Sequence, residues 1–543
     1  MLAALLAFAL ITAEPQAANA VVVCPQEFLP ALHPWLAHRQ LQGHRFRYIS
    51  NTGSAEQIRT AIRQVARGGK LQAILLVGDA EPSAASDPQV RVRCIPAHRT
   101  AALVNVKFGS EPEIGTDNWY ADLDDDNLPD LAIGRIPADT PQELSRIVRK
   151  ILNYETGLDH GPWRQRISFV AGVGGFGALT DSVIETATKK LLTDGIPATY
   201  QTTMTFGSWR SPFCPDPRQF HNTTVARHNE GCLFWVYLGH GHSTALDRVA
   251  VPGGRFHILD CDDCGKLQAE KSPPVAIMLA CYTAAFDLEQ DCLAEEMLRS
   301  PGGPVAVFGG SRVTMPYAMA VMGSEMLSEY FRSRPKTLGE VIRNAKRRMA
   351  LPPDEKQGLA NANRVLLDGV ASVISPARNM LDDERREHLH LFNLIGDPLL
   401  TLSYPREMSI ETAADAVAGQ TLRAAIMPPI GGRLVCELVC RRDVFKTNLP
   451  VRDRFDPSNA GLARLQEDYL RANDPVWSRQ VIDVPTPGEM DKPLEVLLHV
   501  PDEARGAAHV RVLVQGANEH AAGSANLFIR PVVKQHGSAS SIP

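Results

Sequence analysis

Several features that would assign this chain to a common functional class are missing from its sequence. It has no long run of Lys or Arg and its formal net charge is −5, so charge gives no reason to expect a nucleic-acid partner. Beyond residue 20, no segment approaches the roughly 18 consecutive apolar residues that a membrane helix needs. The H-E-x-x-H and G-x-S-x-G motifs are also absent, so metallopeptidase and serine-hydrolase functions lack their usual anchors.

Length and composition favour a soluble protein of several domains. The chain has 543 residues, of which 44% are hydrophobic and 22% are charged; these proportions are ordinary for globular proteins. We expect a signal peptide at 1–20, an N-terminal α/β subdomain at 21–160, a catalytic α/β subdomain at 161–404, a β-sandwich at 405–532 and a disordered tail at 533–543.

The first twenty residues have the layout of a secretory signal. About twelve apolar residues precede Ala18-Asn19-Ala20, an A-x-A cleavage pattern. This layout predicts a secreted, envelope or periplasmic protein. No Lys or Arg precedes the apolar stretch, so a buried first strand or a mis-assigned start codon remains an alternative, and the protein would then be cytoplasmic.

Strand and helix patterns alternate twice before residue 404. Short apolar runs such as VVVC, AILLVG, CLFWVYLG and VAIMLAC alternate with helical spacing, which is typical of mostly parallel sheets covered on both faces. Thr140-Pro141-Gln142-Glu143 is a capping-box pattern that begins a helix. The sequence therefore predicts two α/β units side by side. After Tyr404, strand runs separated by turn residues predict a small antiparallel sandwich.

Two of the apolar strands end in chemically useful residues. One strand ends in His240-Gly241 and another ends in Cys281. Ligands bind beyond the carboxyl ends of strands in open α/β sheets, so neighbouring parallel strands would present both side chains at one edge. A thiol with an adjacent imidazole can attack a carbonyl and protonate the leaving amine. The backbone N–H groups of Gly241 and Cys281 could stabilise the oxyanion. A core cysteine and an ordinary loop histidine are the structural alternative.

The segments around these residues resemble the gingipain family, in the caspase-like clan of cysteine peptidases. They are LLVGDA, DLDDDNLPDLAIGRIP, YLGHGHST, LACYTAAFD, GGPVAVFGGSR and FNLIGDP, in the family's order. The resemblance implies a caspase-like catalytic unit, an immunoglobulin-like sandwich after residue 404, and endopeptidase activity on proteins or peptides. It assigns the histidine role to His240 and the nucleophile role to Cys281, which would form a thioester acyl-enzyme.

Three features qualify that assignment. His242 is a rival base, although the His-Gly pairing belongs to His240. The family's long pro-segment has no counterpart before the first predicted strand. Ala284 stands where glycine is expected after the nucleophile, a difference that would narrow the cleft or reduce activity.

An acidic loop at residues 122–130 predicts calcium binding. Asp122, Asp124, Asp126 and Asp130 have the spacing of a calcium loop, and so many like charges in one turn repel one another unless a cation neutralises them. The loop is not an EF-hand, because position six is Asn127 and position twelve is Ile133. A solvated acidic turn is the alternative. Calcium is also implied by the family resemblance.

The resemblance suggests two further roles for acidic residues. Asp130 resembles the family's carboxylate that orients the catalytic histidine, a role that competes with calcium binding. Glu143 resembles an acidic residue associated with recognition of a basic side chain before the scissile bond. Its position in a capping box gives Glu143 a purely structural explanation as well.

Two short motifs carry weaker signals. Gly172, Gly174 and Gly177 spell the dinucleotide fingerprint, but the next strand carries no acidic residue to bind a ribose. Cys261 and Cys264 form a C-x-x-C without the second pair that a zinc ribbon needs. We therefore predict a tight turn at the first motif and a disulfide or free thiols at the second.

The sequence thus predicts a secreted cysteine endopeptidase. A catalytically weak or inactive binding or adhesion protein of the cell envelope on the same scaffold is the alternative. A nucleotide-dependent oxidoreductase is a weaker rival.

Overall fold

The computed structural model describes residues 17–157, 159–172, 195–352, 359–485 and 492–531. Most of the predicted signal peptide, the glycine motif beyond Gly172, the helix predicted at 181–193 and the predicted tail lie outside these ranges. No helix within the described ranges is long and apolar enough to cross a bilayer.

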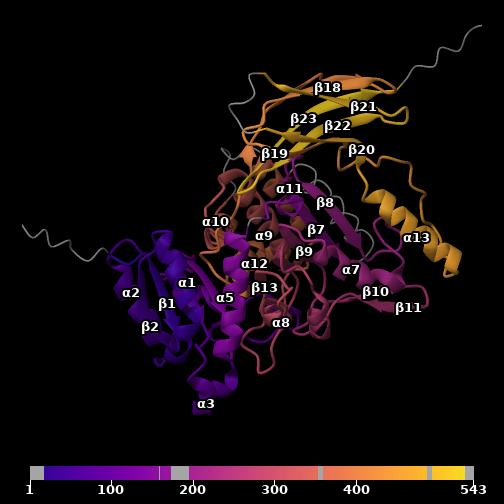
Figure 1. Cartoon of the computed structure of the whole chain (residues 1–543). Helices are drawn as coiled ribbons and strands as arrows, with labels where there is room; N and C mark the ends of the chain where they lie inside the picture. Colours follow the sequence, from indigo (N-terminus) through magenta and orange to yellow (C-terminus); the bar gives the residue numbers. More distant parts are fainter. Residues whose placement is uncertain (1–16, 158, 173–194, 353–358, 486–491, 532–543) are drawn as a thin grey trace, which may run out of the picture.

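A single ten-stranded sheet runs through the whole region before residue 404 (Figure 1). In spatial order its strands are β2 (Phe46–Ser50), β1 (Ala20–Cys24), β3 (Ala73–Val77), β6 (Ala132–Ile136), β14 (Phe392–Ile395), β13 (Ala306–Gly310), β12 (Val275–Leu279), β9 (Phe234–Leu238), β7 (Arg166–Ala171) and β8 (Gln201–Phe206). The mixed α/β class with a large, mostly parallel sheet is confirmed.

The direction of the strands reverses once, between β14 and β13. Every other neighbouring pair is parallel. The two predicted α/β units therefore share one continuous sheet, and their strands run in opposite directions. β14, from the end of the second predicted unit, joins them by pairing with β6 at Ile395 and Arg135. As a result, residues that precede β6 lie at the same sheet edge as residues that follow β9 and β12.

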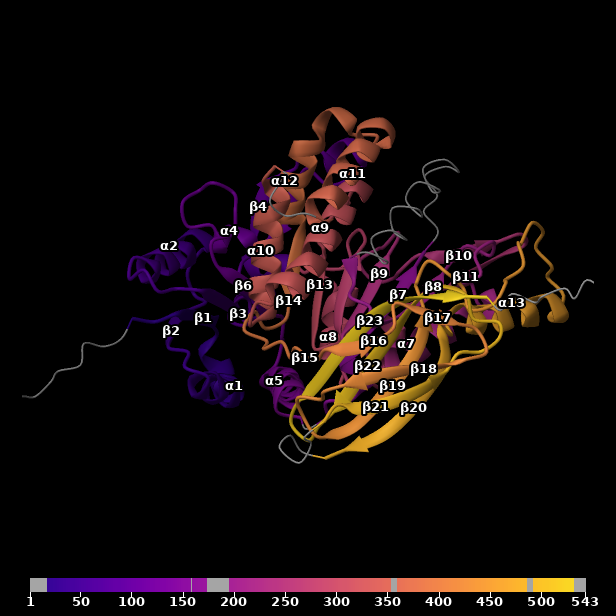
Figure 2. The same cartoon turned by 90° about the horizontal axis from the view of Figure 1, so that it is seen from above.

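Helices cover both faces of the sheet (Figure 2). Alternate residues of β1 point to opposite faces: Val22 joins the core beneath α1 (Leu29–Leu41) and α5 (Pro141–Thr156), whereas Val21 joins a second core beneath α2 (Ala55–Ala66). In the described part of this region, the other helices of eight or more residues are α7 (Phe220–Asn229), α9 (Pro316–Ser328), α10 (Leu338–Ala350), α11 (Leu359–Ile374) and α12 (Leu381–Leu391). The shorter α8 (Leu293–Arg299) also packs against the sheet.

The C-terminal region forms two layers of strands around one core. One sheet contains β15 (Arg406–Glu407), β17 (Asp415–Val417), β19 (Gly432–Cys440), β20 (Val476–Val484), β22 (Gly506–Gln515) and β23 (His520–Arg530), and the other contains β16 (Ile410–Thr412), β18 (Thr421–Ile426) and β21 (Leu494–His499). Side chains of both sheets share a hydrophobic cluster. This is the layered β-structure that the turn-separated strand runs predict.

A helix interrupts this region and packs against the α/β unit. α13 (Asn459–Ala472) lies between β19 and β20 and was not predicted from the sequence. The Asn473 side chain donates to Met204 O at 3.0 Å and accepts from Met204 N at 2.8 Å on the edge strand β8. Arg442 donates to the carbonyls of Ile196, Pro197 and Tyr200. The sandwich is therefore docked on the α/β unit.

Candidate active site

The strands that carry His240 and Cys281 are direct neighbours in the sheet. β9 and β12 are parallel, with Leu238 opposite Leu279, and each reactive residue follows its strand end by two positions. The backbone N–H of Gly239 donates to Leu279 O at 3.4 Å. His240 and Cys281 therefore lie at the same edge of the sheet, at equivalent positions after their strands.

Gly241 brings the histidine loop against the backbone of the cysteine. A Cβ atom at this position would lie 2.6 Å from Cys281 O and 2.9 Å from Thr283 Cγ2, so a side chain cannot be placed there without moving one of the two loops. Gly241 faces Leu246 across an antiparallel bridge that uses His240 O and His242 N. The N–H of Gly241 therefore points away from that bridge.

The sulfur of Cys281 is half-buried against Thr314. The backbone N–H of Thr314 lies 3.3 Å from Sγ, its hydroxyl lies 3.6 Å from Sγ, and the thiol points to Thr314 O at 3.7 Å. Thr314 follows β13, the strand next to β12. The backbone N–H of Thr314 is directed at this sulfur, whereas the Thr314 hydroxyl also lies 3.0 Å from Met319 Sδ, so its one proton serves either sulfur atom.

The backbone of His240 is held by a buried tyrosine. Tyr237 Oη donates to His240 O at 2.8 Å, and Asp247 N donates to the same carbonyl at 3.2 Å. Gly239, with φ of 155°, permits this contact, because a Cβ there would lie 2.8 Å from Tyr237 Oη. The imidazole of His240 is exposed, as is that of His242.

The loop after the nucleophile is tied to the loop after β13. Tyr282 has a left-handed backbone (φ 57°) and donates its N–H to Arg312 O at 3.2 Å. Arg312 makes a bidentate pair with Asp287 at 2.6 and 2.7 Å, and both side chains are buried. A strained non-glycine conformation persists only where the surroundings enforce it, and here these contacts do so.

Ala284 lies beneath this loop, not on the surface. It is fully buried, its N–H donates to Gly310 O at 2.9 Å, and its methyl group faces Gly309. Ala284 therefore does not line the surface of a cleft directly, and the expectation that it reduces activity stays a prediction.

The acidic loop brings three of its four predicted ligands together. Oxygen atoms of Asp122, Asp124 and Asp130 lie within 4.8 Å of one another. Asp126 is outside this group and caps Leu128 N at 2.7 Å. Both carboxylate oxygens of Asp122 accept backbone N–H groups, while Asp130 also contacts Arg347 Nη1 at 3.1 Å.

The structure corrects the orienting role expected of Asp130. Asp130 precedes β6 and lies at the same sheet edge as His240, but β14, β13 and β12 separate β6 from β9. Four strand spacings put the two strands about 19 Å apart, which is too far for a hydrogen bond. Its carboxylate instead accepts the N–H of Leu123 at 2.9 Å.

Glu143 lies away from the nucleophile as well. It follows β6, whose carboxyl end is at the edge opposite Cys281. Its side chain accepts from Asp139 N at 3.0 Å, and its own N–H donates to Thr140 Oγ1 at 3.2 Å. Thr140 therefore caps α5 as predicted, but the Glu143 side chain binds the N–H of Asp139 and not that of Thr140, so the reciprocal half of the capping box is not formed. This position corrects the expectation that Glu143 contacts substrate near Cys281.

The C-x-x-C motif contains two free thiols. All ten cysteines lie in the described ranges and none forms a disulfide. Burial raises the pKa of Cys261 to about 12, with a further contribution from nearby acidic side chains, and it raises the pKa of Cys264 further. Both sulfurs are therefore held as thiols.

Comparison with known proteins identifies the family. The model for peptidase family C25 matches residues 13–403. The chain belongs to this family. Lys-gingipain of Porphyromonas gingivalis is 23% identical over 293 residues, which are 54% of this chain and 15% of that relative. Lys-gingipain W83 of the same organism is 24% identical over 294 residues, with the same two shares. The predicted resemblance to gingipains is confirmed, and the chain spans only a small part of these relatives.

Solved structures support the fold. The crystal structure of the Arg-specific cysteine proteinase gingipain R (RGPB) superposes with a TM-score of 0.52 at 16% identity, covering 95% of this chain and 98% of the other. A complex of the Porphyromonas gingivalis RgpB pro- and mature domains gives 0.51 at 15% identity, covering 94% and 100%. At this identity the likeness concerns the fold alone.

Four residues of the site were missed by sequence reasoning. Thr314, Tyr282, Arg312 and Asp287 surround the nucleophile. Arg312 and Asp287 stand in the segments that resemble the family, so an ion pair between those segments was open to prediction. Nothing in the sequence pattern links Thr314 to Cys281, because the contact depends on β12 and β13 lying side by side.

Proposed function

We propose that this chain is a secreted cysteine endopeptidase that hydrolyses peptide bonds of proteins or peptides through Cys281 and His240. The observation that carries the proposal is the contact between the two strand-end loops, where Gly241 lies against the backbone of Cys281. Membership of a peptidase family supports the same reading. The half-buried sulfur beside the backbone N–H of Thr314 is suited to a nucleophile.

The reaction follows from these groups. The Cys281 thiolate attacks the scissile carbonyl carbon, and the carbonyl oxygen becomes an oxyanion that accepts hydrogen bonds from the N–H groups of Gly241 and Cys281. Protonated His240 gives its proton to the leaving amine as the C–N bond breaks, which leaves a thioester on Cys281. Neutral His240 then takes a proton from water, whose oxygen attacks the thioester and restores the thiolate. The product is a free carboxylic acid.

Calcium in the loop at 122–130 is a second proposal. Asp122, Asp124 and Asp130 supply the oxygen ligands that a hard cation takes. Burial raises the pKa of Asp122 despite its hydrogen bonds from Asn127 and Asp125, and a bound cation would favour its ionised form. Calcium here would neutralise the loop and stabilise it; we assign it no part in the reaction.

The location of the protein outside the cytoplasm is also a proposal. It rests on the apolar stretch and A-x-A pattern of residues 1–20 and on the likeness to gingipains. Ala20 begins the buried strand β1, so N-terminal sequencing of the protein from an exporting host should find the apolar stretch removed by cleavage at or before this residue, and an uncleaved chain in the cytoplasm would contradict the proposal.

A nucleophile test separates the peptidase from a binding protein on the same scaffold. The chain is assayed with thiol reductant and calcium against a mixed peptide library, beside Cys281→Ala, His240→Ala and the control Cys261→Ser, which changes another half-exposed thiol. We expect both active-site variants to lose at least about 1,000-fold in kcat/KM and the control to keep its activity. Cleavage that survives Cys281→Ala would exclude the proposed nucleophile. Peptide binding without cleavage by the unaltered chain would favour the binding protein.

A further inference from the structure

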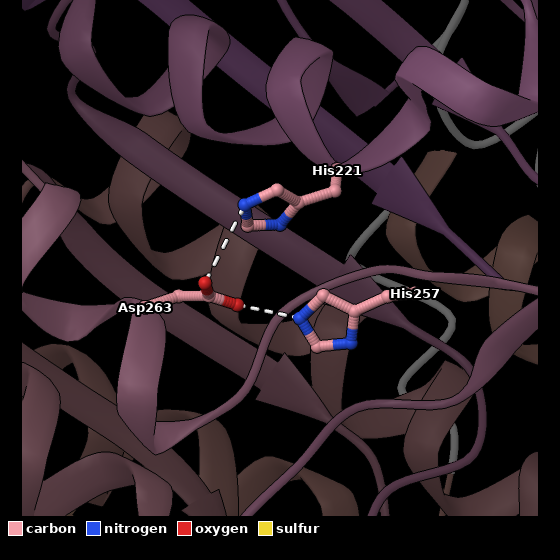
Figure 3. Close-up of side chains that lie close together, drawn as sticks. All are labelled: His221, His257 and Asp263. Atoms are coloured by element: carbon pink, nitrogen blue, oxygen red, sulfur yellow. Dashed lines mark hydrogen bonds and ion pairs between the residues drawn. The ribbon is translucent and has the colours of Figure 1, made fainter.

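A cluster of two histidines and one aspartate lies outside the candidate active site. His221 belongs to the first turn of α7, His257 ends β11 (Gly254–His257), and Asp263 lies in the 3-10 helix Cys261–Lys266. One ligand atom from each residue lies within 4.8 Å of the others. Figure 3 shows the carboxylate of Asp263 between the two imidazole rings. We propose that these three residues bind a zinc ion.

The distances are close to those of a three-ligand site. His221 Nε2 lies 3.4 Å from Asp263 Oδ1, and His257 Nε2 lies 2.5 Å from Asp263 Oδ2. A tetrahedral zinc ion, at about 2.0–2.2 Å from each ligand, separates its ligand atoms by roughly 3.3–3.6 Å. The two distances involve different oxygens of the Asp263 carboxylate, and the contact between His257 and Asp263 must open by about 1 Å to admit the ion. Two imidazoles and one carboxylate are ligands that zinc takes, with one position left for water.

The hydrogen bond that His221 makes leaves its other ring nitrogen facing Asp263. Its Nδ1 lies 3.0 Å from Ile258 O, and because a carbonyl only accepts, Nδ1 is the donor. Nε2 lies 3.4 Å from Asp263 Oδ1 and is the ring nitrogen that would bind an ion. A histidine that donates its other N–H to a backbone carbonyl is the usual arrangement of a metal ligand.

Two further charged side chains, Lys266 and Asp260, lie beside the three proposed ligands. Lys266 Nζ contacts Asp263 Oδ1 at 2.7 Å from a largely exposed side chain, so it can swing away when an ion enters. Asp260 Oδ2 lies 3.6 Å from His257 Nε2, and within the described ranges its buried Oδ1 has no hydrogen-bond partner. The Asp263 carboxylate accepts hydrogen bonds from Lys266 Nζ at 2.7 Å and from the backbone N–H of Asp260 at 3.1 Å.

The cluster is joined to the loop that carries His240. The segment before the 3-10 helix pairs with that loop: Ala245 bridges Asp260, Leu246 N donates to Leu259 O at 2.8 Å, and Cys261 N donates to Thr244 O at 3.0 Å. The hairpin of β10 (Arg248–Val251) and β11 links the two. A zinc ion would fasten this hairpin to α7 and so stabilise the base of the histidine loop.

Zinc binding is measured on the full chain carrying Cys281→Ala, which removes the half-exposed active-site thiol as a competing ligand. Competition with a chromogenic zinc indicator and metal analysis should give one zinc ion per chain. His221→Asn and His257→Asn should each weaken binding by at least about 100-fold, while the control His499→Asn, which changes an exposed histidine of the sandwich, should leave it unchanged. Thermal melts establish that each variant is folded.

Two further measurements test the site without altering either histidine. Lys266→Ala removes the cation that competes for Asp263 and should tighten zinc binding by about 5-fold. Bound zinc should slow amide exchange in residues 248–257. Zinc affinity that is unchanged in both histidine variants, or that Lys266→Ala fails to raise, would overturn the site. Because the protein used is inactive by design, these outcomes do not depend on the proposed peptidase activity.

Discussion

At the scale of single residues, the position of Gly241 is the strongest constraint on the site. The nearest backbone atom of the cysteine loop is 2.6 Å from the place where a Cβ would lie. A contact this short requires one of the two loops to move by several tenths of an ångström or more. The loops carry the proposed base, His240, and the proposed nucleophile, Cys281, so such a movement would act directly on their alignment.

Gly241→Ala should therefore reduce activity without unfolding the protein. We expect kcat/KM to fall by about 100-fold, since a shift of about 1 Å in a reacting group costs that much, with a small change in Tm. Gly369→Ala is the matched control, because no heavy atom lies within 4 Å of a Cβ at that position in α11. Equal kcat/KM in Gly241→Ala and the unaltered chain would show that the two loops are not aligned as described.

At the scale of elements, the loops after β12 and β13 form one unit around the sulfur. Arg312 and Asp287 are both buried and joined by two hydrogen bonds, and Arg312 O also accepts the N–H of the left-handed Tyr282. Tyr282 Oη donates to Glu111 at 2.8 Å; burial, together with this neighbouring carboxylate, raises the pKa of Tyr282 to about 12. The geometry of the nucleophile thus depends on a buried ion pair that touches neither reactive side chain.

Removing one charge of this pair should be costly. Asp287→Asn leaves the buried Arg312 guanidinium with only the exposed Glu111 carboxylate, 3.6 Å away, as a counter-charge, and we expect a loss of about 3 kcal/mol in the free energy of unfolding together with reduced activity. Glu495→Gln is the control, because its pair with Arg423 is exposed and should contribute less than about 1 kcal/mol. Urea unfolding of both variants measures the difference. If the free energy of unfolding falls equally in the two variants, the buried pair of Asp287 and Arg312 stabilises the protein no more than an exposed pair does.

The packing of α12 against α9 should make stability depend on pH. Glu384 in α12 is buried and accepts from Ala318 N at 3.0 Å. Burial raises its pKa to about 7, with a smaller contribution from Glu387. A carboxyl group with a raised folded-state pKa stabilises the fold fully below its unfolded pKa of about 4.5, and this contribution is lost as the pH rises through about 7.

Glu384→Gln should remove that dependence. Between pH 5 and pH 8 the unaltered chain should lose on the order of 2 kcal/mol of stability that the variant keeps. Chemical denaturation at the two pH values measures this, and Glu467→Gln, at an exposed site on α13, serves as the control. An identical pH slope in Glu384→Gln and the unaltered chain would contradict the buried, protonated carboxyl group.

At the scale of the whole molecule, the sandwich and the α/β unit are joined by α13 and the segments beside it. Asn473 completes hydrogen bonds of the edge strand β8, and Tyr469 Oη lies 3.0 Å from Thr205 Oγ1 and accepts from Arg227 at 2.8 Å. An edge strand whose polar groups are paired is protected from pairing with other chains. The insertion between β19 and β20 therefore closes one end of the ten-stranded sheet.

Asn473→Ala should expose that edge. Loss of two hydrogen bonds to Met204 should destabilise the contact by about 1–3 kcal/mol and speed amide exchange in residues 201–206. Asn448→Ala, at an exposed position of the same insertion, should change neither quantity. Unchanged exchange in Asn473→Ala would show that the insertion does not hold β8.

The sequence alone determined the class of the fold and the two residues that we propose are reactive. Apolar runs that alternate with helical spacing specify a sheet covered on both faces, and the capping pattern at Thr140–Glu143 specifies the start of α5. His240 and Cys281 follow two such runs, so their positions at one edge follow from local pattern and the general behaviour of parallel strands. These features depend on residues that are close together in the chain.

Only the tertiary structure decided which distant residues meet. The reversal of strand direction at β14 places Glu143 at the edge opposite Cys281. The order of the strands separates Asp130 from His240 by four strand spacings. Neither arrangement could be predicted from the motifs along the chain. Thr314 reaches Cys281 because β13 lies beside β12, and His221 reaches Asp263 because a hairpin folds back on α7. Strand order and register are properties of the assembled sheet, since they depend on packing between segments that no local pattern connects.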